Sequence, residues 1–212
     1  MQPFHDVLLL LVVLTDFWVL GTTRLSSMIR AAAVQGLLLA ALPVALYPRV
    51  SLHIVGLAIG TLLVKAVLLP RLLTRAIREA AVRREIEPLI GFTASLILAA
   101  AAVALSFAIA PRLELPGTPS SVLIPVALST VIIGLIVLTT RNKALTQVVG
   151  YLILENGIYV FGLSQAERVP FLVEVGVLLD VFAGVFIMGI VVFHINREFD
   201  SLDSARLTEL RD

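Results

Sequence analysis

Long runs of apolar residues follow one another along almost the entire chain. A helix needs about 20 mainly apolar residues to cross the hydrocarbon core of a bilayer, and the sequence contains seven such runs. They cover roughly residues 5–23, 31–48, 51–70, 89–110, 122–140, 145–164 and 171–194. Because lipid offers the backbone no hydrogen-bond partner, each run is expected to form a helix. The sequence therefore predicts an all-α fold, a polytopic transmembrane helix bundle of about seven spans.

Basic residues predict the orientation of this bundle, because cytoplasmic loops carry an excess of lysine and arginine. They cluster after the first, third, fifth and seventh spans, while each other connection holds one arginine. The clusters are Arg24 and Arg30; Arg71, Arg75, Arg78, Arg83 and Arg84; Arg141 and Lys143; and Arg197, Arg206 and Arg211. The alternation predicts an N-terminus outside and a C-terminus in the cytoplasm.

The same pattern divides the chain into three regions. Residues 1–121 are predicted to form a four-span membrane region, 122–195 a three-span region and 196–212 a cytoplasmic tail. The Arg-rich segment 71–88 has an amphipathic helical pattern, which indicates an interfacial helix or an extension of the third span. It is expected to anchor the chain on anionic lipid or, alternatively, to dock a cytoplasmic partner.

Composition excludes several kinds of site. Of the residues, 59% are hydrophobic, against about 45–50% in a typical soluble domain on a broader count. The chain has no cysteine, which excludes thiolate metal sites and cysteine-held iron–sulfur clusters. Its three histidines do not suit a haem across the bundle, and no phosphate loop, metal cluster or nucleophile–base pair occurs. The sequence gives no sign of nucleic-acid binding, and predicts no cofactor in this chain and no catalytic residue.

Two acidic residues lie deep within apolar spans. Glu155 lies about eight residues from the outer end of the sixth span, and Asp180 about nine from that of the seventh. Charged groups at this depth are costly and usually serve proton or ion transfer. Since the two depths match, Glu155 and Asp180 are predicted to form a proton relay, with Asn156 adding an amide beside them. The alternative is a neutral acid that only fixes helix packing.

Further polar residues are candidates for the same path. Lys65, in the third span, either pairs with Glu155 or Asp16 or extends its ammonium group to the interface. Asp16 lies at a similar depth in the first span, so an Asp16–Lys65 ion pair is the simplest expectation. Glu174 and His194 are candidates for the two ends of the path, although each also suits a solvated helix end. In the third span, Gly56 and Gly60 would let another helix approach closely.

The last three spans resemble the small three-helix subunit K of respiratory complex I and its relative, the C component of multi-subunit cation/proton antiporters. The similar residues are Thr140-Arg141-Asn142 at a turn, Gly150-Tyr151-Leu152-Ile153-Leu154-Glu155-Asn156, and Asp180-Val181-Phe182-Ala183-Gly184. In that family the first acid falls near Leu152, about one turn before Glu155. With its additional N-terminal spans, the chain resembles the hydrogenase-4 component E family of formate hydrogenlyase-type complexes.

This resemblance implies a membrane-arm subunit of an energy-converting redox complex in a prokaryotic cytoplasmic membrane. Its expected partners are large antiporter-like membrane subunits, a membrane anchor and hydrogenase-like peripheral subunits. The nickel–iron centre and iron–sulfur clusters would lie in those partners, so this chain would be a non-catalytic subunit of an oxidoreductase. Two alternatives are a structural scaffold without proton transfer and a subunit of a sodium/proton antiporter.

Overall fold

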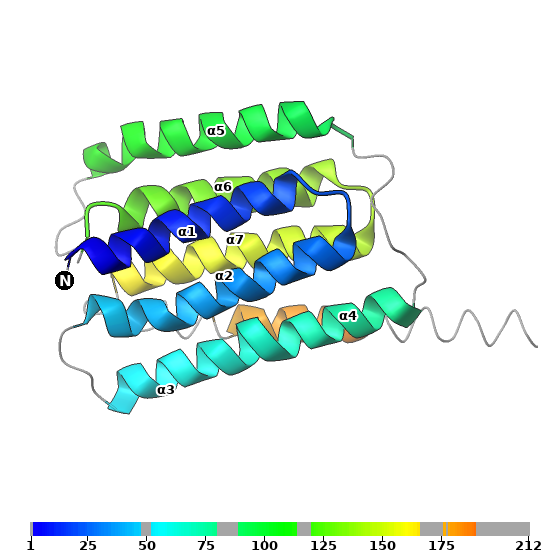
Figure 1. The fold of residues 1–212 in the computed structure, drawn as a ribbon, viewed down its shortest axis with the longest axis horizontal. Helices are drawn as coiled ribbons and strands as arrows, with labels where there is room; N and C mark the ends of the chain where they lie inside the picture. The colour runs from blue at the N-terminus through cyan, green and yellow to red at the C-terminus, as the bar shows by residue number, and fades with distance from the viewer. Residues whose placement is uncertain are drawn as a thin grey trace, which may run out of the picture.

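Every regular element that the structure describes is a helix. The computed structural model describes residues 2–47, 52–79, 89–113, 120–165, 176 and 178–189. Its helices run side by side as an elongated bundle (Figure 1). For these residues the all-α prediction is confirmed.

The helices follow the predicted apolar runs in order. They are α1 (Gln2–Leu20), α2 (Leu25–Leu46), α3 (Leu52–Thr61), the π-helix η1 (Leu62–Leu68), α4 (Leu69–Glu79), α5 (Phe92–Ile109), the short 3-10 helix η2 (Ala110–Leu113), α6 (Leu123–Thr140), α7 (Ala144–Ser164) and a last helix, Leu178–Gly189.

Five helical segments of the described chain are long and apolar enough to cross a membrane. They are Leu25–Leu46, Ile54–Arg78, Phe92–Leu113, Leu123–Thr140 and Ala144–Ser164. The total of seven spans and the orientation of the termini stay predictions. The seventh predicted span is described mainly over Leu178–Gly189, which is an apolar helix.

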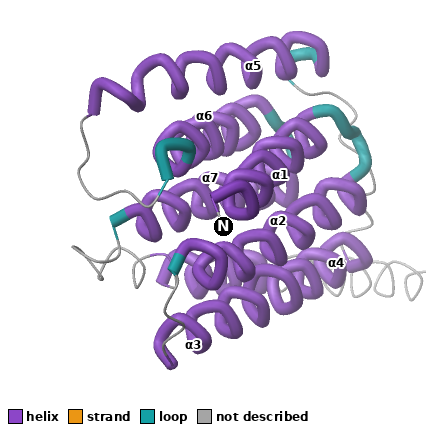
Figure 2. The backbone as a smooth tube through the Cα atoms, turned by 60° about the vertical axis from the view of Figure 1, so that its left-hand side comes forward, coloured by secondary structure: helices purple, strands orange, loops and turns teal. Residues whose placement is uncertain are grey.

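Helices α6 and α7 form the centre of the bundle. Within the described residues, 61% of the α6 span and 67% of the α7 span are buried, against 22% for the spans formed by α3–η1–α4 and by α5. Figures 1 and 2 show these two outer spans on opposite sides, with α1 and α2 packed beside α6 and α7. The outer spans therefore offer most of their surface to lipid or to other subunits.

The second and third spans differ in extent from the prediction. Helix α2 begins at Leu25 instead of near residue 31, because the exposed side chain of Arg30 is accommodated on the helix surface, where its Nε donates to Ser26 O. The third span continues without a break through α4 to Glu79. The segment that starts at Arg71 is thus an extension of this span as far as Glu79, and residues 80–88 lie outside the described part.

Arg141 fastens the turn between α6 and α7 to two other helices. Only 1% of its surface is exposed. Its guanidinium donates to the carbonyl of Leu20, at the end of α1, at 3.1 Å and lies 4.9 Å from the ring centre of Phe92, at the start of α5. Helix ends leave carbonyl groups without intrahelical partners, so this buried arginine joins α1, α5 and the turn at one end of the bundle.

Three glycines allow α6 and α7 to pack with their backbones in contact. A Cβ added at Gly134 would overlap the backbone of Leu154. One added at Gly150 would lie 2.6 Å from Leu138 N, and one at Gly157 would lie 2.6 Å from Val131 N. By contrast, a Cβ at Gly56 or Gly60 would meet no described atom within 4 Å, so the close approach predicted there is not made by the described residues of this chain.

We expect Gly134→Ala to destabilise the bundle, because the added methyl group must push α6 and α7 apart. Overpacking of this kind costs about 1–3 kcal/mol. Gly60→Ala is the matched control, since the same methyl group enters open space there. The measurement is the free energy of unfolding in mixed detergent micelles. Equal effects of the two substitutions would contradict the close packing of α6 on α7.

Candidate functional site

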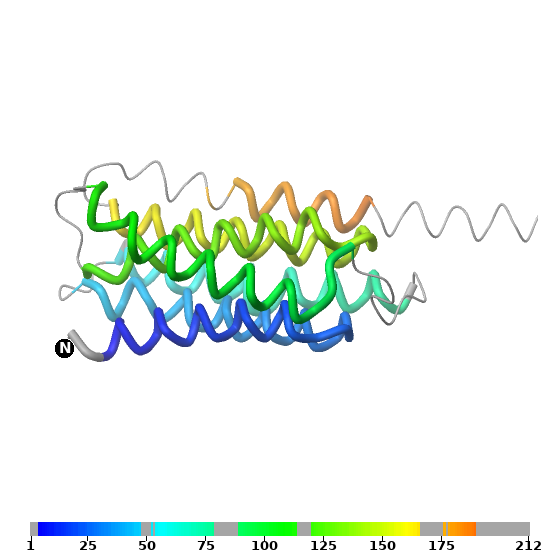
Figure 3. Tube along the Cα trace, turned by 90° about the horizontal axis from the view of Figure 1, so that it is seen from above, coloured from blue at the N-terminus to red at the C-terminus, as the bar shows by residue number. Residues whose placement is uncertain are grey.

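Lys65, Glu155 and Asp180 form a buried ion cluster at mid-length of the bundle. The Nζ of Lys65 donates to Oε2 of Glu155 and, at 2.9 Å, to Oδ1 of Asp180. Exposed fractions are 5% for Lys65, 0% for Glu155 and 4% for Asp180. The three side chains come from η1, α7 and the last helix, and Figure 3 shows the last helix running beside α7. Glu155 follows Lys65 by 90 positions and Asp180 follows it by 115, so the fold joins residues that are far apart in the sequence.

Lys65 is held inside the bundle by the backbone around it. It lies in the π-helix Leu62–Leu68, a rare geometry that occurs often at functional sites. A Cβ added at Gly36 of α2 would lie 2.7 Å from the carbonyl carbon of Lys65 and 2.9 Å from its Cβ. Gly36 thus lets α2 lie directly against the π-helix, and the lysine does not extend to the interface.

An aromatic ring and a hydroxyl group complete the surroundings of the lysine. The Nζ of Lys65 lies 5.5 Å from the ring centre of Tyr159, a distance suited to a cation–π interaction. The Tyr159 hydroxyl and Thr61 Oγ1 are 3.0 Å apart and share a hydrogen bond. Tyr159 lies one helical turn after Glu155 on α7, so the same helix contributes both an acid and a ring to the cation.

The cluster brings two carboxyl groups to one ammonium group. If all three were charged, a negative charge would remain in a buried site, which is unfavourable unless it is paired. Oε1 of Glu155 is buried and has no hydrogen-bond partner among the described residues. A Cβ at Gly176 would lie 3.4 Å from that oxygen, so a glycine faces it. The arrangement can hold one exchangeable proton between two acids.

A second polar group lies beside this cluster and is centred on Asp16 of α1. Its Oδ1 accepts a hydrogen bond from Gln35 Nε2 at 2.7 Å, and its Oδ2 accepts one from Thr130 Oγ1 at 2.8 Å. Gln35 Oε1 in turn accepts one from Asn156 Nδ2 at 2.8 Å. The expected Asp16–Lys65 ion pair is therefore wrong: the amide of Gln35 binds the acid, and Lys65 binds the acids of the other helices.

The two groups meet at consecutive residues of α7. Glu155 belongs to the ion cluster, and Asn156 begins the path through Gln35 to Asp16. The resulting buried array crosses the bundle from α1 through α2 and α7 to η1 and the last helix. Amide groups carry no proton that is readily lost, so the Asp16 side of the array can orient hydrogen bonds but does not by itself pass on a proton.

Sequence reasoning identified the acids, Asn156 and Lys65 but missed Gln35, Thr130, Thr61 and Tyr159. Gln35 is a long amide at the middle of an apolar run, which is a signal of the same kind as Glu155. Thr130, Thr61 and Tyr159 gave no such signal, because such residues are ordinary in membrane helices. The predicted path ends, Glu174 and His194, lie outside the described residues.

Metal binding is not supported by the residues present. The chain contains no cysteine, and among the described residues no three histidine, aspartate or glutamate side chains are grouped so as to hold a metal ion. The chemistry available at the centre of the bundle is that of carboxyl, ammonium, amide and hydroxyl groups.

Comparison with known proteins gives relatives over most of the chain. The hydrogenase-4 component E proteins of Escherichia coli K12 and of Shigella flexneri are each 30% identical over 148 residues, which cover 69% of this chain and 68% of theirs. This chain belongs to the hydrogenase-4 component E family. The uncharacterized protein Rv0085 of Mycobacterium tuberculosis is 36% identical over 204 residues, or 94% of this chain and 92% of that protein. No family model matches the chain, and no solved structure matches it.

These relatives confirm the resemblance to the hydrogenase-4 component E family that the sequence indicated. Together with the five apolar helices, membership of this family identifies the chain as a membrane protein. The resemblance of the last three spans to the complex I and antiporter subunits stays a prediction.

We expect Lys65→Met to destabilise the protein strongly, because two buried carboxyl groups would lose their only ammonium partner among the described residues. Breaking a buried ion pair from one side costs about 3–5 kcal/mol. The triple variant Lys65→Met, Glu155→Gln, Asp180→Asn should recover most of this loss, since no buried charge remains. Lys143→Met, at an exposed lysine, is the control. The measurement is the free energy of unfolding of the three variants in mixed micelles. If Lys65→Met lost no more of this free energy than Lys143→Met, the ion cluster would be contradicted.

Proposed function

We propose that this chain is a membrane-arm subunit of a hydrogenase-type redox complex, and that its Lys65–Glu155–Asp180 cluster carries protons. Family membership supports the first part, since the relatives are components of hydrogenase-4. The second part is carried by one observation: two fully buried acids share one ammonium group, and one oxygen of Glu155 has no partner among the described residues. A prokaryotic cytoplasmic membrane is the proposed location.

The cluster is suited to gain and lose a proton as its surroundings change. When Lys65 pairs closely with one carboxylate, the other acid is favoured in its neutral form, because a second buried charge would be uncompensated. A small shift of the ammonium group between Glu155 and Asp180 would exchange these roles.

Each residue then has a distinct proposed role. Glu155 is the central carrier, Asp180 the adjacent relay and Lys65 the cation whose position sets which acid is protonated. Asn156 and Asp16 hold the neighbouring helices in register through Gln35, and Asp16 joins the relay only if water bridges the amides. Glu174 and His194 remain the proposed ends of the path.

The electron chemistry is assigned to other chains of the proposed complex. The nickel–iron centre and iron–sulfur clusters would lie in peripheral subunits, held by a membrane anchor beside large antiporter-like subunits. Redox change there would alter the hydration or pairing of the buried cluster. Moving one charge through 100 mV corresponds to about 2.3 kcal/mol, which is comparable with one strong hydrogen bond to a charged group, so a modest rearrangement is sufficient.

We expect Glu155→Gln in the assembled complex to lower the rate of proton translocation by about 100-fold or more, the lower end of the range for a positioned proton-transfer group. The amide keeps the size of the side chain but cannot exchange a proton. Asp6→Asn is the matched control, because it makes the same chemical change at a half-exposed acid near the start of α1. The measurement is acidification of vesicles at a fixed rate of electron transfer.

Subunit composition must be checked in parallel, because a scaffold would give a different result. Loss of assembly in Glu155→Gln would favour a structural role for the acid. Intact assembly with normal translocation would contradict the proton path directly. Translocation that requires sodium, in a complex without redox subunits, would instead indicate an antiporter.

A further inference from the structure

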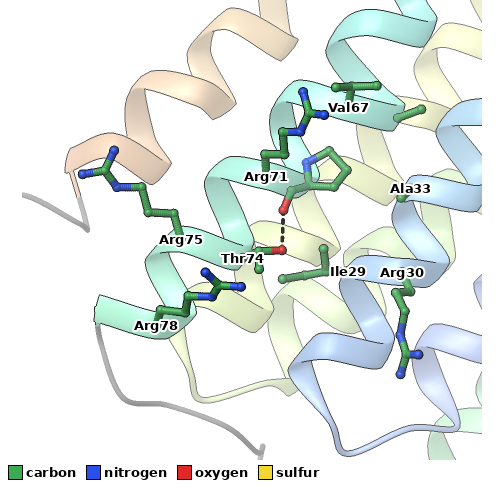
Figure 4. Close-up of a pocket in the computed structure, with 10 residues that line it drawn as sticks. Ile29, Arg30, Ala33, Val67, Arg71, Thr74, Arg75 and Arg78 are labelled. Atoms are coloured by element: carbon green, nitrogen blue, oxygen red, sulfur yellow. Dashed lines mark hydrogen bonds between the residues drawn. The ribbon is translucent and has the colours of Figure 1, made fainter.

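A groove lined by four arginines opens between α2 and α4. It has a volume of about 520 Å³. Figure 4 shows Arg71, Arg75 and Arg78 along α4, with Arg30 on α2 across from them. The remaining lining is largely apolar and consists of Ile29, Ala33, Ala66, Val67 and Pro70, with Thr74 among the arginines. The groove therefore combines a strongly basic part with a hydrocarbon-like part.

The basic part lies at one end of the bundle. Arg30 is in the second turn of α2, and the other three arginines are spread along the short helix α4. Figure 1 shows that the start of α2, the end of α4 and the α6–α7 turn all lie at the same end. The basic clusters that predict the cytoplasmic side of the membrane lie at this end of the bundle. An occupant of the groove would thus lie where lipid headgroups meet the hydrocarbon core.

Three of these arginines, Arg30, Arg71 and Arg78, form no ion pair with an acid of the described residues. Among the residues that the structure describes, no aspartate or glutamate lines the groove. Arg30 donates to the backbone carbonyl of Ser26, a neutral group that does not cancel its charge. A positive potential of this kind repels hydronium and metal cations and attracts anions. The groove is therefore unsuited as a proton entry, although Ala66 adjoins Lys65.

The apolar part decides which kind of anion fits. A small soluble anion needs donors on several sides and gains nothing from contact with Ile29, Val67 and Pro70. A phospholipid gains from both parts, because its phosphate pairs with guanidinium groups while its acyl chain covers apolar surface. Basic pockets between membrane helices on the cytoplasmic side are known sites for anionic headgroups. The α3–η1–α4 span is an outer one, so lipid has access to it.

We propose that this groove binds an anionic phospholipid, with its phosphate between Arg30, Arg71 and Arg78 and one acyl chain along Ala33, Ala66 and Val67. The bound lipid fixes the end of α4 against α2. Because η1 precedes α4 without a break, this contact also steadies the helix that carries Lys65. The site does not depend on proton transfer, and it can be present whether or not the proposed function holds.

The test uses the full-length chain in a mild detergent, titrated with dioleoylphosphatidylglycerol or dioleoylphosphatidylcholine. We expect the anionic lipid to raise the unfolding temperature at concentrations where the zwitterionic lipid has little effect. A basic residue near the membrane surface contributes about fivefold to the affinity for anionic lipid. The double variant Arg71→Gln, Arg78→Gln should therefore raise the half-saturating concentration by about 25-fold, the product of two such factors.

Arg24→Gln is the matched control, because Arg24 is exposed at the same end but does not line the groove. Without lipid, the double variant should keep the wild-type circular dichroism and unfolding temperature, since neither Arg71 nor Arg78 is buried. A double variant that responds to phosphatidylglycerol like the wild type would overturn the proposal. So would a loss of about fivefold in Arg24→Gln, the same per charge removed, which would indicate general surface charge instead of a site.

Two further arms distinguish other occupants. Inorganic phosphate that reproduces the stabilisation at equal concentration would overturn the lipid and indicate a soluble anion. A photoreactive residue at Thr74, placed in the chain within intact cells, should cross-link to phospholipid. Cross-links only to another protein would show that a partner protein fills the groove, and would overturn the proposal.

Discussion

The pairing of Lys65 with Glu155 and Asp180 is the interaction on which the centre of this bundle depends. Three ionisable groups from η1, α7 and the last helix are removed from solvent together, and each is tolerated only because the others are present. Lys65 has its position because Gly36 lets α2 lie against the π-helix. Glu155 has its position because glycines let α7 lie against α6. Backbone packing thus fixes the geometry in which the charges meet.

The polar side chains form an array across the bundle, transverse to the helix axes. In one half of the array, both carboxylate oxygens of Asp16 accept hydrogen bonds, one from Gln35 and one from Thr130. These bonds link α1, α2 and α6. The other half contains the acids, the ammonium group and an oxygen of Glu155 that has no partner in the described part of the chain. The two halves suit different tasks: the amide half holds helices in register, and the ionic half is the part proposed to exchange protons. A transverse array also suits a subunit that passes protons or electrostatic change to a neighbouring protein in the membrane.

Much of this fold could be predicted from the sequence, because a long apolar run in a chain has few alternatives to a helix. The similar depth of Glu155 and Asp180 was predicted by counting residues. Glu155 was one of the two partners considered for Lys65, and the structure joins Lys65 to both acids. The partner of Asp16 could not be predicted, because depth alone cannot tell which helices are neighbours. Lys65 was the partner expected for Asp16, whereas the packing of α1 on α2 places Gln35 against this acid. The π-helix and the burial of Arg141 also depend on tertiary contacts that no local pattern contains.

Infrared difference spectroscopy of the complex during turnover would reveal whether a carboxyl group of this cluster holds an exchangeable proton. We expect a protonated-carboxyl C=O band that shifts in heavy water, changes between redox states and is lost in Glu155→Gln. A spectrum that is the same in the wild type and in Glu155→Gln, with no carboxyl band that changes on turnover, would contradict the presence of this proton.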